Sequence, residues 1–239
     1  MTPLTLNFLN YFGSKVKIGL RYPPPQYDVI IEPFAGGAGY ASNYPERQII
    51  LTDRDENVAA LWTYLITSPA EDIAKLPVVP AAELGDIRTN AQTKDLCLGA
   101  KLLLASWYST SSRFPLWTTT DWGGTTWTEK RRDRIAENLK YIRHWTFVHQ
   151  GWDRSVDFER EDGKQTWFVD PPYNNRAGRD YRHHNIDYIW LGMWCKKRTG
   201  QIIVCENLGA RWLPFQQQMA INGIKGRETA VEVYWTNTP

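Results

Sequence analysis

An aspartate, two prolines and a tyrosine close a short apolar run in the second half of the chain. The run Trp167 to Val169 predicts a buried strand that ends at Asp170, Pro171, Pro172 and Tyr173. The prolines fix φ and donate no amide hydrogen, so the loop is stiff and presents carbonyl oxygens beside a flat ring. Open α/β sheets bind ligands at the carboxyl ends of their strands, which is where Asp170 falls. The segment is typical of a clamp for a planar, amino-bearing group such as a nucleobase. A strand that ends in a plain polyproline turn is the alternative.

A glycine-rich loop is the second candidate for binding chemistry. It follows the apolar run Tyr27 to Ile31, and it begins with a glutamate. A strand, a glycine-rich turn and a helix together let backbone amides approach a nucleotide-like ligand closely. The spacing differs from the dinucleotide fingerprint. A glutamate at the strand end favours a positively charged ligand, such as a sulfonium with an amino group, over a pyrophosphate. A plain tight turn is the alternative. The candidate contacts are Glu32, Phe34, Ala35, Gly36, Gly37 and Gly39.

An acidic residue after the next apolar run fits the same kind of site. The run Gln48 to Leu51 predicts a second strand that ends at Thr52 and Asp53. In such folds an acidic residue about twenty residues after the glycines binds ribose hydroxyls, so Asp53 is the ribose candidate. Asp55 is placed to cap a helix from Glu56 to Ile66.

The amino-terminal segment carries an aromatic residue and a lysine around a Gly-Ser turn. Tyr11 and Lys15 precede a predicted helix from Val16 to Leu20. One interpretation places Lys15 and the backbone around Tyr11 against a carboxylate-bearing ligand. The alternative is a helix whose amino end is capped by Ser14, which is a common arrangement.

The elements that must position these residues follow an α/β pattern. Strand patterns recur at Trp145 to Gln150, Gln201 to Cys205 and Thr229 to Thr236, the last alternating like an edge strand, and a helix is predicted at Asp187 to Cys195. The length of 239 residues suits one α/β domain, with or without a smaller insert. Trp152 or Asp153, just after the predicted strand Trp145 to Gln150, is a candidate for the wall of an adenine pocket. Core packing is the alternative for Trp152.

The pattern changes between Ser68 and about His144. Helices are predicted at Asp95 to Tyr108 and Glu129 to Tyr141, and they flank a segment rich in Ser, Thr, Gly and Trp from Ser109 to Thr128. The net charge is +2, and twelve Trp and twelve Tyr suit stacking on bases as well as core packing. The basic cluster at the start of the second helix and the Trp-bearing segment favour contact with nucleic acid, with a solvated loop and a charged helix face as the alternative. The candidate contacts are Arg113, Trp117, Trp122, Lys130, Arg131, Arg132, Arg134, Arg176 and Arg179.

Other chemistries have weaker signals. The three cysteines have neither CxxC nor metal-like spacing, which indicates reduced thiols in a cytosolic setting. His183 and His184 have no acidic or cysteine partners at ligand spacing, so no metal is expected. The sequence contains neither a signal peptide nor an apolar run of membrane length. We therefore expect a cytoplasmic protein, in a bacterium or a phage-infected host cell.

Four motifs occur in a fixed order, with a basic insertion between the third and the fourth. They are Tyr11-Phe12-Gly13-Ser14-Lys15, Glu32-Pro33-Phe34 with its glycines, Asp53, and Asp170-Pro171-Pro172-Tyr173. In this order the sequence resembles the Dam-like (class alpha, DPPY-motif) DNA adenine N6-methyltransferases, which phages and restriction–modification systems often encode. The closing VEVYWTN is similar to the last strand of that family. The resemblance implies a Rossmann-like S-adenosylmethionine-dependent methyltransferase sheet from residues 1–67 and 145–239. A small, mainly helical target-recognition insertion would occupy 68–144.

The resemblance also implies roles for individual residues. Asp170, with the Pro171 carbonyl, would accept the hydrogens of the target amino group, Pro172 would stiffen the loop, and Tyr173 would stack on the extruded base. The implied partner is DNA, double-stranded, bound by a monomer or weak dimer that needs no other protein, no membrane and no metal. The residues that would contact S-adenosylmethionine are Tyr11, Lys15, Glu32, Phe34 to Gly39, Asp53 and Asp170.

One region departs from the family. Ser109 to Thr128 lacks the Asn/Arg/Phe-rich hairpin of GATC readers, and Arg113-Phe114-Pro115 is only faintly similar, so recognition of GATC is not implied. Two other functions stay open. One is a nucleic-acid-binding protein of the same fold without turnover, and the other is methylation of RNA or single-stranded DNA. The intact Asp170 and Glu32 favour an enzyme.

Overall fold

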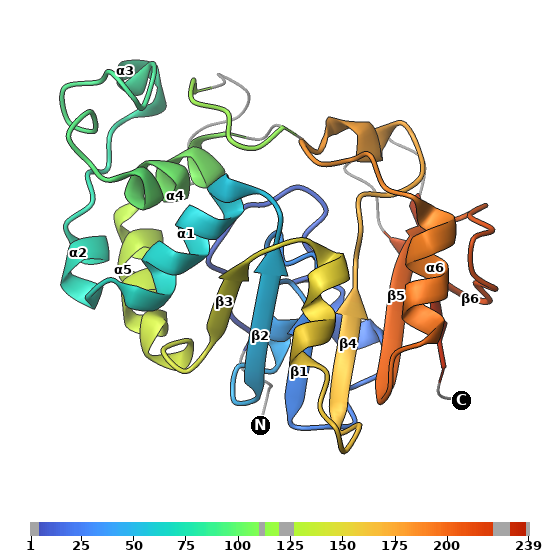
Figure 1. Cartoon of the computed structure of the whole chain (residues 1–239). Helices are drawn as coiled ribbons and strands as arrows, with labels where there is room; N and C mark the ends of the chain where they lie inside the picture. The colour runs from blue at the N-terminus through green and yellow to red at the C-terminus, as the bar shows by residue number, and fades with distance from the viewer. Residues whose placement is uncertain (1–4, 110–112, 120–126, 222–229, 238–239) are drawn as a thin grey trace.

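Seven strands form one sheet in the order β3-β2-β1-β4-β5-β7-β6 (Figure 1). This arrangement comes from a computed structural model that describes residues 5–109, 113–119, 127–221 and 230–237. Neighbouring strands pair in parallel from β3 to β5, whereas β7 runs antiparallel to both β5 and β6. The strands are β1 (Val29–Glu32), β2 (Gln48–Asp53), β3 (Thr146–His149), β4 (Gln165–Val169), β5 (Gln201–Asn207), β6 (Gln217–Ile221) and β7 (Ala230–Thr236).

The order of the parallel strands creates a switch point between β1 and β4. From β1 the chain adds β2 and β3 on one side, and later adds β4 and β5 on the other. Connections that leave in opposite directions open a crevice at the carboxyl ends of β1 and β4, which is where doubly wound sheets bind their ligands. The central strands β1 and β4 are buried along their whole length, as parallel strands covered on both faces must be. The α/β class predicted from the sequence is confirmed.

Helices α1 and α6 begin at polar caps that the sequence supplies. Asp55 accepts the Asn57 amide at 2.8 Å at the start of α1, and Asp187 accepts the Trp190 amide at 2.9 Å at the start of α6. The helices are α1 (Glu56–Thr67), α2 (Ala70–Ala74), α3 (Ala81–Leu84), α4 (Leu98–Tyr108), α5 (Glu129–Asn138) and α6 (Tyr188–Lys196). Short 3-10 helices are η1 (Gly19–Arg21), η2 (Ala41–Asn43), η3 (Leu139–Tyr141), η4 (Trp152–Phe158) and η5 (Ala177–Asp180).

The two faces of the sheet have separate apolar cores. On the face that we call the α1 face, Ile30, Phe168 and Ile203 pack in one large cluster with side chains of α1, α4 and α5. On the opposite face, the α6 face, Trp167 packs with Leu191 of α6 and with side chains of β1 and β5. Alternate residues of each strand therefore serve different cores.

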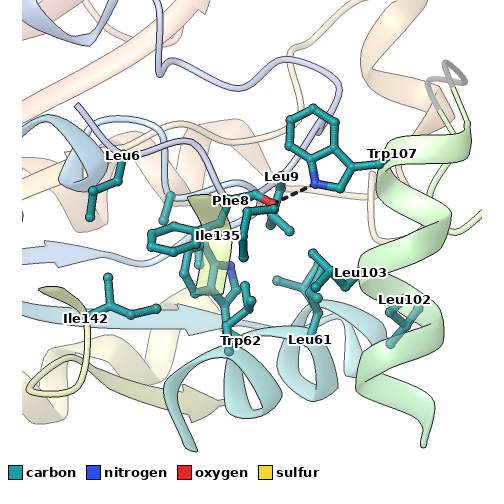
Figure 2. Close-up of a cluster of buried hydrophobic side chains, with 14 of the residues drawn as sticks. Leu6, Phe8, Leu9, Leu61, Trp62, Leu102, Leu103, Trp107, Ile135 and Ile142 are labelled. Carbon is teal, nitrogen blue, oxygen red and sulfur yellow. Dashed lines mark hydrogen bonds between the residues drawn. The ribbon is translucent and has the colours of Figure 1, made fainter. Parts of the chain in front are cut away.

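Helices of the predicted insertion belong to the larger core. Figure 2 shows Trp107 of α4 beside Phe8 and Leu9 of the amino-terminal segment, and Trp107 Nε1 donates to the Phe8 carbonyl at 2.9 Å. Leu103 of the same helix lies beside Leu61 of α1. The predicted insertion thus shares buried side chains with the sheet. Its behaviour as a separate recognition domain stays a prediction.

Several local predictions were wrong. Val16 to Leu20 forms turns and part of η1 instead of an α-helix, because the prolines at 23–25 end the segment after barely one turn. The glycine-rich loop leads into the 3-10 helix η2 and not into an α-helix. The Asn43 side chain donates to the Gly39 carbonyl there, and Pro45 disfavours a helical Tyr44.

The predicted edge strand near the carboxyl end is an inner strand. β7 lies between β5 and β6, and the sequence analysis missed β6. Within the described residues, no helix combines the length and the apolar character needed to cross a bilayer.

Candidate functional site

Five polar residues extend the α1 face beyond the apolar core. Side chains alternate along a strand, so Glu32 follows Ile30, Asp53 follows Leu51, and Asp170 follows Phe168 onto that face. On β5, the residue after Cys205 on the same face is Asn207, and its register partner on β7 is Glu232. The five residues, from adjacent strands, are Asp53, Glu32, Asp170, Asn207 and Glu232.

These residues line one cavity of about 500 Å³ at the switch point. The structure brings the predicted cofactor contacts into its wall, with the exception of Ala38, although these contacts come from four separate segments. The predicted residues that line it are Tyr11, Lys15, Glu32, Phe34, Ala35, Gly36, Gly37, Gly39, Asp53, Asp170, Pro171, Pro172 and Tyr173.

Glu32 is a buried carboxyl at the bottom of this site. It is 2% exposed and accepts the Ala41 amide at 2.6 Å. Burial raises the pKa of Glu32 to about 8, against the smaller opposing effects of that hydrogen bond and of Lys15. The side chain is therefore mostly neutral at pH 7 unless a cation comes close.

Asp53 holds the glycine loop in place. Its carboxylate accepts the Gly36 amide at 3.0 Å and the Asp55 amide at 2.9 Å, while Trp62 donates to the Gly36 carbonyl at 2.8 Å. Gly36 has a φ of +42°, a conformation that side chains disfavour. Burial raises the pKa of Asp53 to about 6, although both amide hydrogen bonds lower it.

The glycine loop touches the amino-terminal motif backbone to backbone. A Cβ on Gly39 would lie 2.6 Å from the Val16 nitrogen and 2.8 Å from the Lys15 carbonyl carbon, which is closer than real atoms approach. Glycine is therefore required at this position for the motif to reach the cavity. The contact fixes the backbone from which Lys15 extends.

Lys15 is buried between two carboxylates. Its Nζ lies 2.8 Å from Asp170 Oδ2 and 3.5 Å from Glu232 Oε1, and the Tyr22 hydroxyl donates to Glu232. Burial lowers the pKa of Lys15, but the two carboxylates outweigh burial and raise it overall, so Lys15 stays charged. Burial also raises the pKa of Asp170, and Lys15 opposes that rise.

Several buried polar atoms of the wall lack a hydrogen-bond partner within the described part of the chain. Such groups are costly to leave unpaired, so each one calls for an explanation, and a ligand is one. The atoms are Ser14 Oγ, Asp170 Oδ1, Tyr173 OH and Asn207 Oδ1. The unpaired Ser14 hydroxyl also rules out the alternative in which Ser14 caps a helix.

Aromatic rings form two parts of the wall. Trp152 stacks on Phe34 at 6.2 Å between ring centroids, and it both lines the cavity and packs against the α6-face core. Asp153, the other adenine-pocket candidate, is not among the lining residues. The Lys15 ammonium lies 5.0 Å from the centroid of the Tyr173 ring. Stacking of Tyr173 on a base stays a prediction.

The segment after the prolines folds back over the cavity. Tyr181 OH donates to the Phe12 carbonyl at 2.9 Å, Arg182 pairs with Glu56, and Gly178 packs directly on the Tyr173 backbone. The sequence indicated only a basic patch here, and it contained no signal for the covering role. Asn207 and Glu232 were also missed as site residues, although the end of the β5 run at Glu206-Asn207 was visible.

The predicted nucleic-acid contacts divide into separate places. Arg176 and Arg179 are exposed beside the cavity mouth, and Arg113 Nε lies 3.8 Å from Asp180 of η5. Trp117 is half-buried beside Arg88, which lies 5.7 Å from its ring centroid, and Trp122 lies outside the described residues.

Helix α5 carries the other four predicted contacts, and none of its residues lines the cavity. Lys130 and Arg134 are exposed. Arg131 lies 3.9 Å from the Trp107 ring centroid, and Arg132 donates to the Leu76 carbonyl at 3.3 Å. These last two side chains therefore contribute to packing inside the protein.

A metal centre finds no support in the described residues, where no group of three or more His, Cys, Asp or Glu is arranged to hold an ion. No protein-family model and no curated protein matches the sequence. One solved structure that matches is described as a conserved hypothetical protein from Streptococcus pyogenes. It is 11% identical, the match covers 87% of this chain and 85% of that chain, and the TM-score is 0.37. A similarity this distant indicates no activity.

Proposed function

We propose that this protein transfers a methyl group from S-adenosylmethionine to the N6 amino group of adenine in DNA, after the base has been flipped out of the duplex. The observation that carries the proposal is the state of Asp170. One carboxylate oxygen is held by Lys15, and the other is buried without a partner in the wall of a cavity at the switch point. An acceptor of this kind suits an amino group.

The residues of the cavity fit S-adenosylmethionine. Glu32 is a buried carboxyl that a positively charged ligand would return to its ionised form. Asp53 lies at the end of the neighbouring strand for ribose hydroxyls, and the stacked Phe34 and Trp152 offer flat surfaces for an adenine ring. When bound, the cofactor would supply an electrophilic methyl group on sulfur.

Asp170 would orient the target nitrogen and stabilise the positive charge that develops on it. The N6 lone pair is delocalised into the ring, so hydrogen bonds from the amino group to Asp170 Oδ1 and the Pro171 carbonyl would turn it toward the methyl group. With the amino group held by Asp170 and the Pro171 carbonyl, N6 would take the methyl carbon as the carbon–sulfur bond breaks. The sulfur would leave as a neutral thioether, and the surplus N6 proton would pass to water. Alignment of two reactants supplies on the order of 7–11 kcal/mol at best. The carboxylate stabilises the positive charge that develops on N6, and no covalent enzyme intermediate is needed.

DNA as the substrate is supported by the charges around the mouth. Arg176 and Arg179 are exposed on the segment that covers the cavity, and phosphate contacts from arginines position a duplex without reading its sequence. The same charges serve RNA or single strands, so the experiment must separate these substrates.

The test is methyl transfer from labelled S-adenosylmethionine to unmethylated genomic DNA, with modified bases mapped by sequencing. We expect N6-methyladenine at one short motif and none with Asp170→Ala, provided that the variant still unfolds cooperatively. Methyl transfer only to RNA or only to single-stranded DNA would replace duplex DNA as the proposed substrate. Cofactor binding without any transfer would favour a binding protein of the same fold, and absence of both would overturn the proposal.

A further inference from the structure

The segment that covers the cavity is closed at its base by one hydrogen bond. It leaves the proline turn at Tyr173, passes through η5 and ends where Tyr188 starts α6. The Tyr188 hydroxyl donates to the Pro172 carbonyl at 2.6 Å, although the two residues are 16 positions apart in the chain. The two ends of the covering segment are therefore joined, as in the compact surface loops that often carry function.

Both peptide groups next to Tyr173 are held by side chains of neighbouring elements. Tyr188 holds the carbonyl of the peptide group on its amino side. On its carboxyl side, the Asn174 amide donates to Glu206 Oε2 at 3.2 Å, and Glu206 is fully buried in β5. The Tyr173 backbone is thus fixed on both sides, while Tyr173 itself lines the cavity.

Trp212 links the two side chains that hold this backbone. Its Nε1 donates to Glu206 Oε2 at 2.9 Å, and its ring centroid lies 5.7 Å from that of Tyr188. Burial raises the pKa of Tyr188 to about 12, so the hydroxyl keeps its proton at neutral pH and remains a donor. Tyr188 is not among the residues that line the cavity, so it can act on a ligand only through neighbours such as Pro172.

We propose that Tyr188 is a positioning residue, which holds the Pro172 carbonyl so that Tyr173 faces a flat ligand in the cavity. The link to a target base rests on the proposed function, because a flipped adenine is then the ligand that stacks on Tyr173. In aligned reactions, a displacement of about 1 Å can lower the rate by about 100-fold. A small movement of this loop should therefore slow the reaction, whereas cofactor binding on the β1–β2 side of the switch point should be unaffected.

The first measurement follows Tyr173 directly and needs no enzyme activity. In protein labelled with fluorotyrosine, the fluorine NMR signal of Tyr173 is assigned by its absence in Tyr173→Phe. Tyr188→Phe removes the hydroxyl that holds Pro172 and keeps the ring that packs on Trp212. We expect one narrow Tyr173 signal in the natural protein, and a shifted or broadened signal in Tyr188→Phe.

Tyr40→Phe is the matched control. The Tyr40 hydroxyl donates to the Pro23 carbonyl at 2.7 Å, so this variant also removes a bond from a tyrosine to a proline carbonyl, but away from the covering segment. Both variants should lose a similar amount of thermal stability. Only Tyr188→Phe should disturb the Tyr173 signal, because only its lost bond holds the Tyr173 backbone.

The second measurement is the steady-state rate of methyl transfer to DNA. Tyr188→Phe should lower kcat about tenfold and leave the KM for S-adenosylmethionine within about twofold of the natural value. Tyr40→Phe should leave both constants within about twofold. A role of Tyr188 in stability alone would not change kcat per folded molecule.

A Tyr173 signal that is unchanged in Tyr188→Phe, or equally disturbed in Tyr40→Phe, would overturn the inference. An active enzyme whose kcat is unchanged in Tyr188→Phe would overturn it as well. If the natural protein transfers no methyl group but Tyr188→Phe alone disturbs the Tyr173 signal, the proposed function fails and the positioning of Tyr173 by Tyr188 stands.

Discussion

Lys15 Nζ lies 2.8 Å from Asp170 Oδ2, and Asp170 Oδ1 has no hydrogen-bond partner among the described residues. One carboxylate thus has two different oxygens. The first is bound to a buried cation, which favours the charged form of Asp170 against burial. The second is buried without a hydrogen bond of ordinary geometry, although the nearby Tyr173 hydroxyl helps to lower the pKa of Asp170, and Glu232 shares the same cation at 3.5 Å.

Removing the cation should destabilise the protein. Lys15→Met leaves Asp170 and Glu232 as buried carboxylates without a counter-charge, and we expect a loss of about 3 kcal/mol in the free energy of unfolding. Urea unfolding at pH 7 measures the loss. Adding Asp170→Asn to Lys15→Met should restore part of the stability, because one uncompensated charge is then gone. If Lys15→Met alone is as stable as the natural protein, this account is contradicted.

Glu32 should make stability depend on pH. Its pKa is about 8 in the folded protein and about 4.5 in the unfolded chain, so the folded state holds its proton more tightly. The resulting stability is full below pH 4.5 and is lost as pH rises through 8, by on the order of 5 kcal/mol at most. Urea unfolding between pH 5 and 9 should show this decline. In Glu32→Gln, which keeps an oxygen for the Ala41 amide, the slope should be smaller, and an unchanged slope would exclude Glu32 as its source.

The same carboxyl should govern cofactor affinity. A sulfonium prefers ionised Glu32, so S-adenosylmethionine should bind more tightly as pH rises from 6 to about 8, by up to about tenfold per pH unit, and level off above. Calorimetric titration at several pH values measures this. Glu32→Gln should bind weakly at all of them. Affinity that falls over this range would contradict a cationic ligand beside Glu32.

Two glycine substitutions distinguish the effect of a steric clash from the effect of backbone strain. Gly39→Ala places a methyl group against the backbone of Lys15 and Val16, so it should shift the amino-terminal motif and weaken cofactor binding at least about tenfold. Gly85→Ala meets nothing within 4 Å and carries only the strain of a φ of +60°. With a ψ of −118°, Gly85 lies outside the left-handed α region, so Gly85→Ala should cost about 1–3 kcal/mol of stability and leave cofactor affinity unchanged. Equal affinities of the two variants would show that the Gly39 contact does not shape the cavity.

The basic side chains of α5 should differ in effect. The double variant Lys130→Ala, Arg134→Ala removes two exposed positive charges and should weaken DNA binding. The slope of log affinity against log salt concentration should become smaller by the amount expected for about two lost phosphate contacts. Arg131→Ala removes a guanidinium packed on Trp107 and should instead lower stability by about 1 kcal/mol. Fluorescence anisotropy at several salt concentrations and thermal unfolding measure the two effects. If the double variant binds DNA normally, α5 does not contact the substrate.

Local sequence patterns were sufficient for the parts of the site that lie within one strand and its following loop. Strand, turn and acidic residue occur together around Glu32, Asp53 and Asp170, so their placement at strand ends followed from the apolar runs. Parallel strands bring such ends to one edge, and the cavity gathers them there. The helix starts at Asp55 and Asp187 could also be predicted from the sequence, because a capping hydrogen bond joins residues that are close in the chain.

The parts that were missed depend on pairing over long distances. Nothing near Glu232 shows that it lies opposite Asn207 or that Tyr22 and Lys15 reach it. The segment at β6 has too few apolar residues for a strand pattern, and its place outside β7 made the apparent edge strand an inner one.

The Lys15 contacts have a consequence for how the protein is made. Lys15 emerges early from the ribosome, but Asp170 follows 155 residues later, and Glu232 lies 210 residues beyond Tyr22. A nascent chain therefore carries a lysine whose two counter-ions do not yet exist. At typical rates of about 5–20 residues per second, that wait lasts on the order of ten seconds or more. Until β7 pairs with β5, the amino-terminal segment has no complete wall to close against, so the wall of the cavity is complete only after β7 has been synthesised.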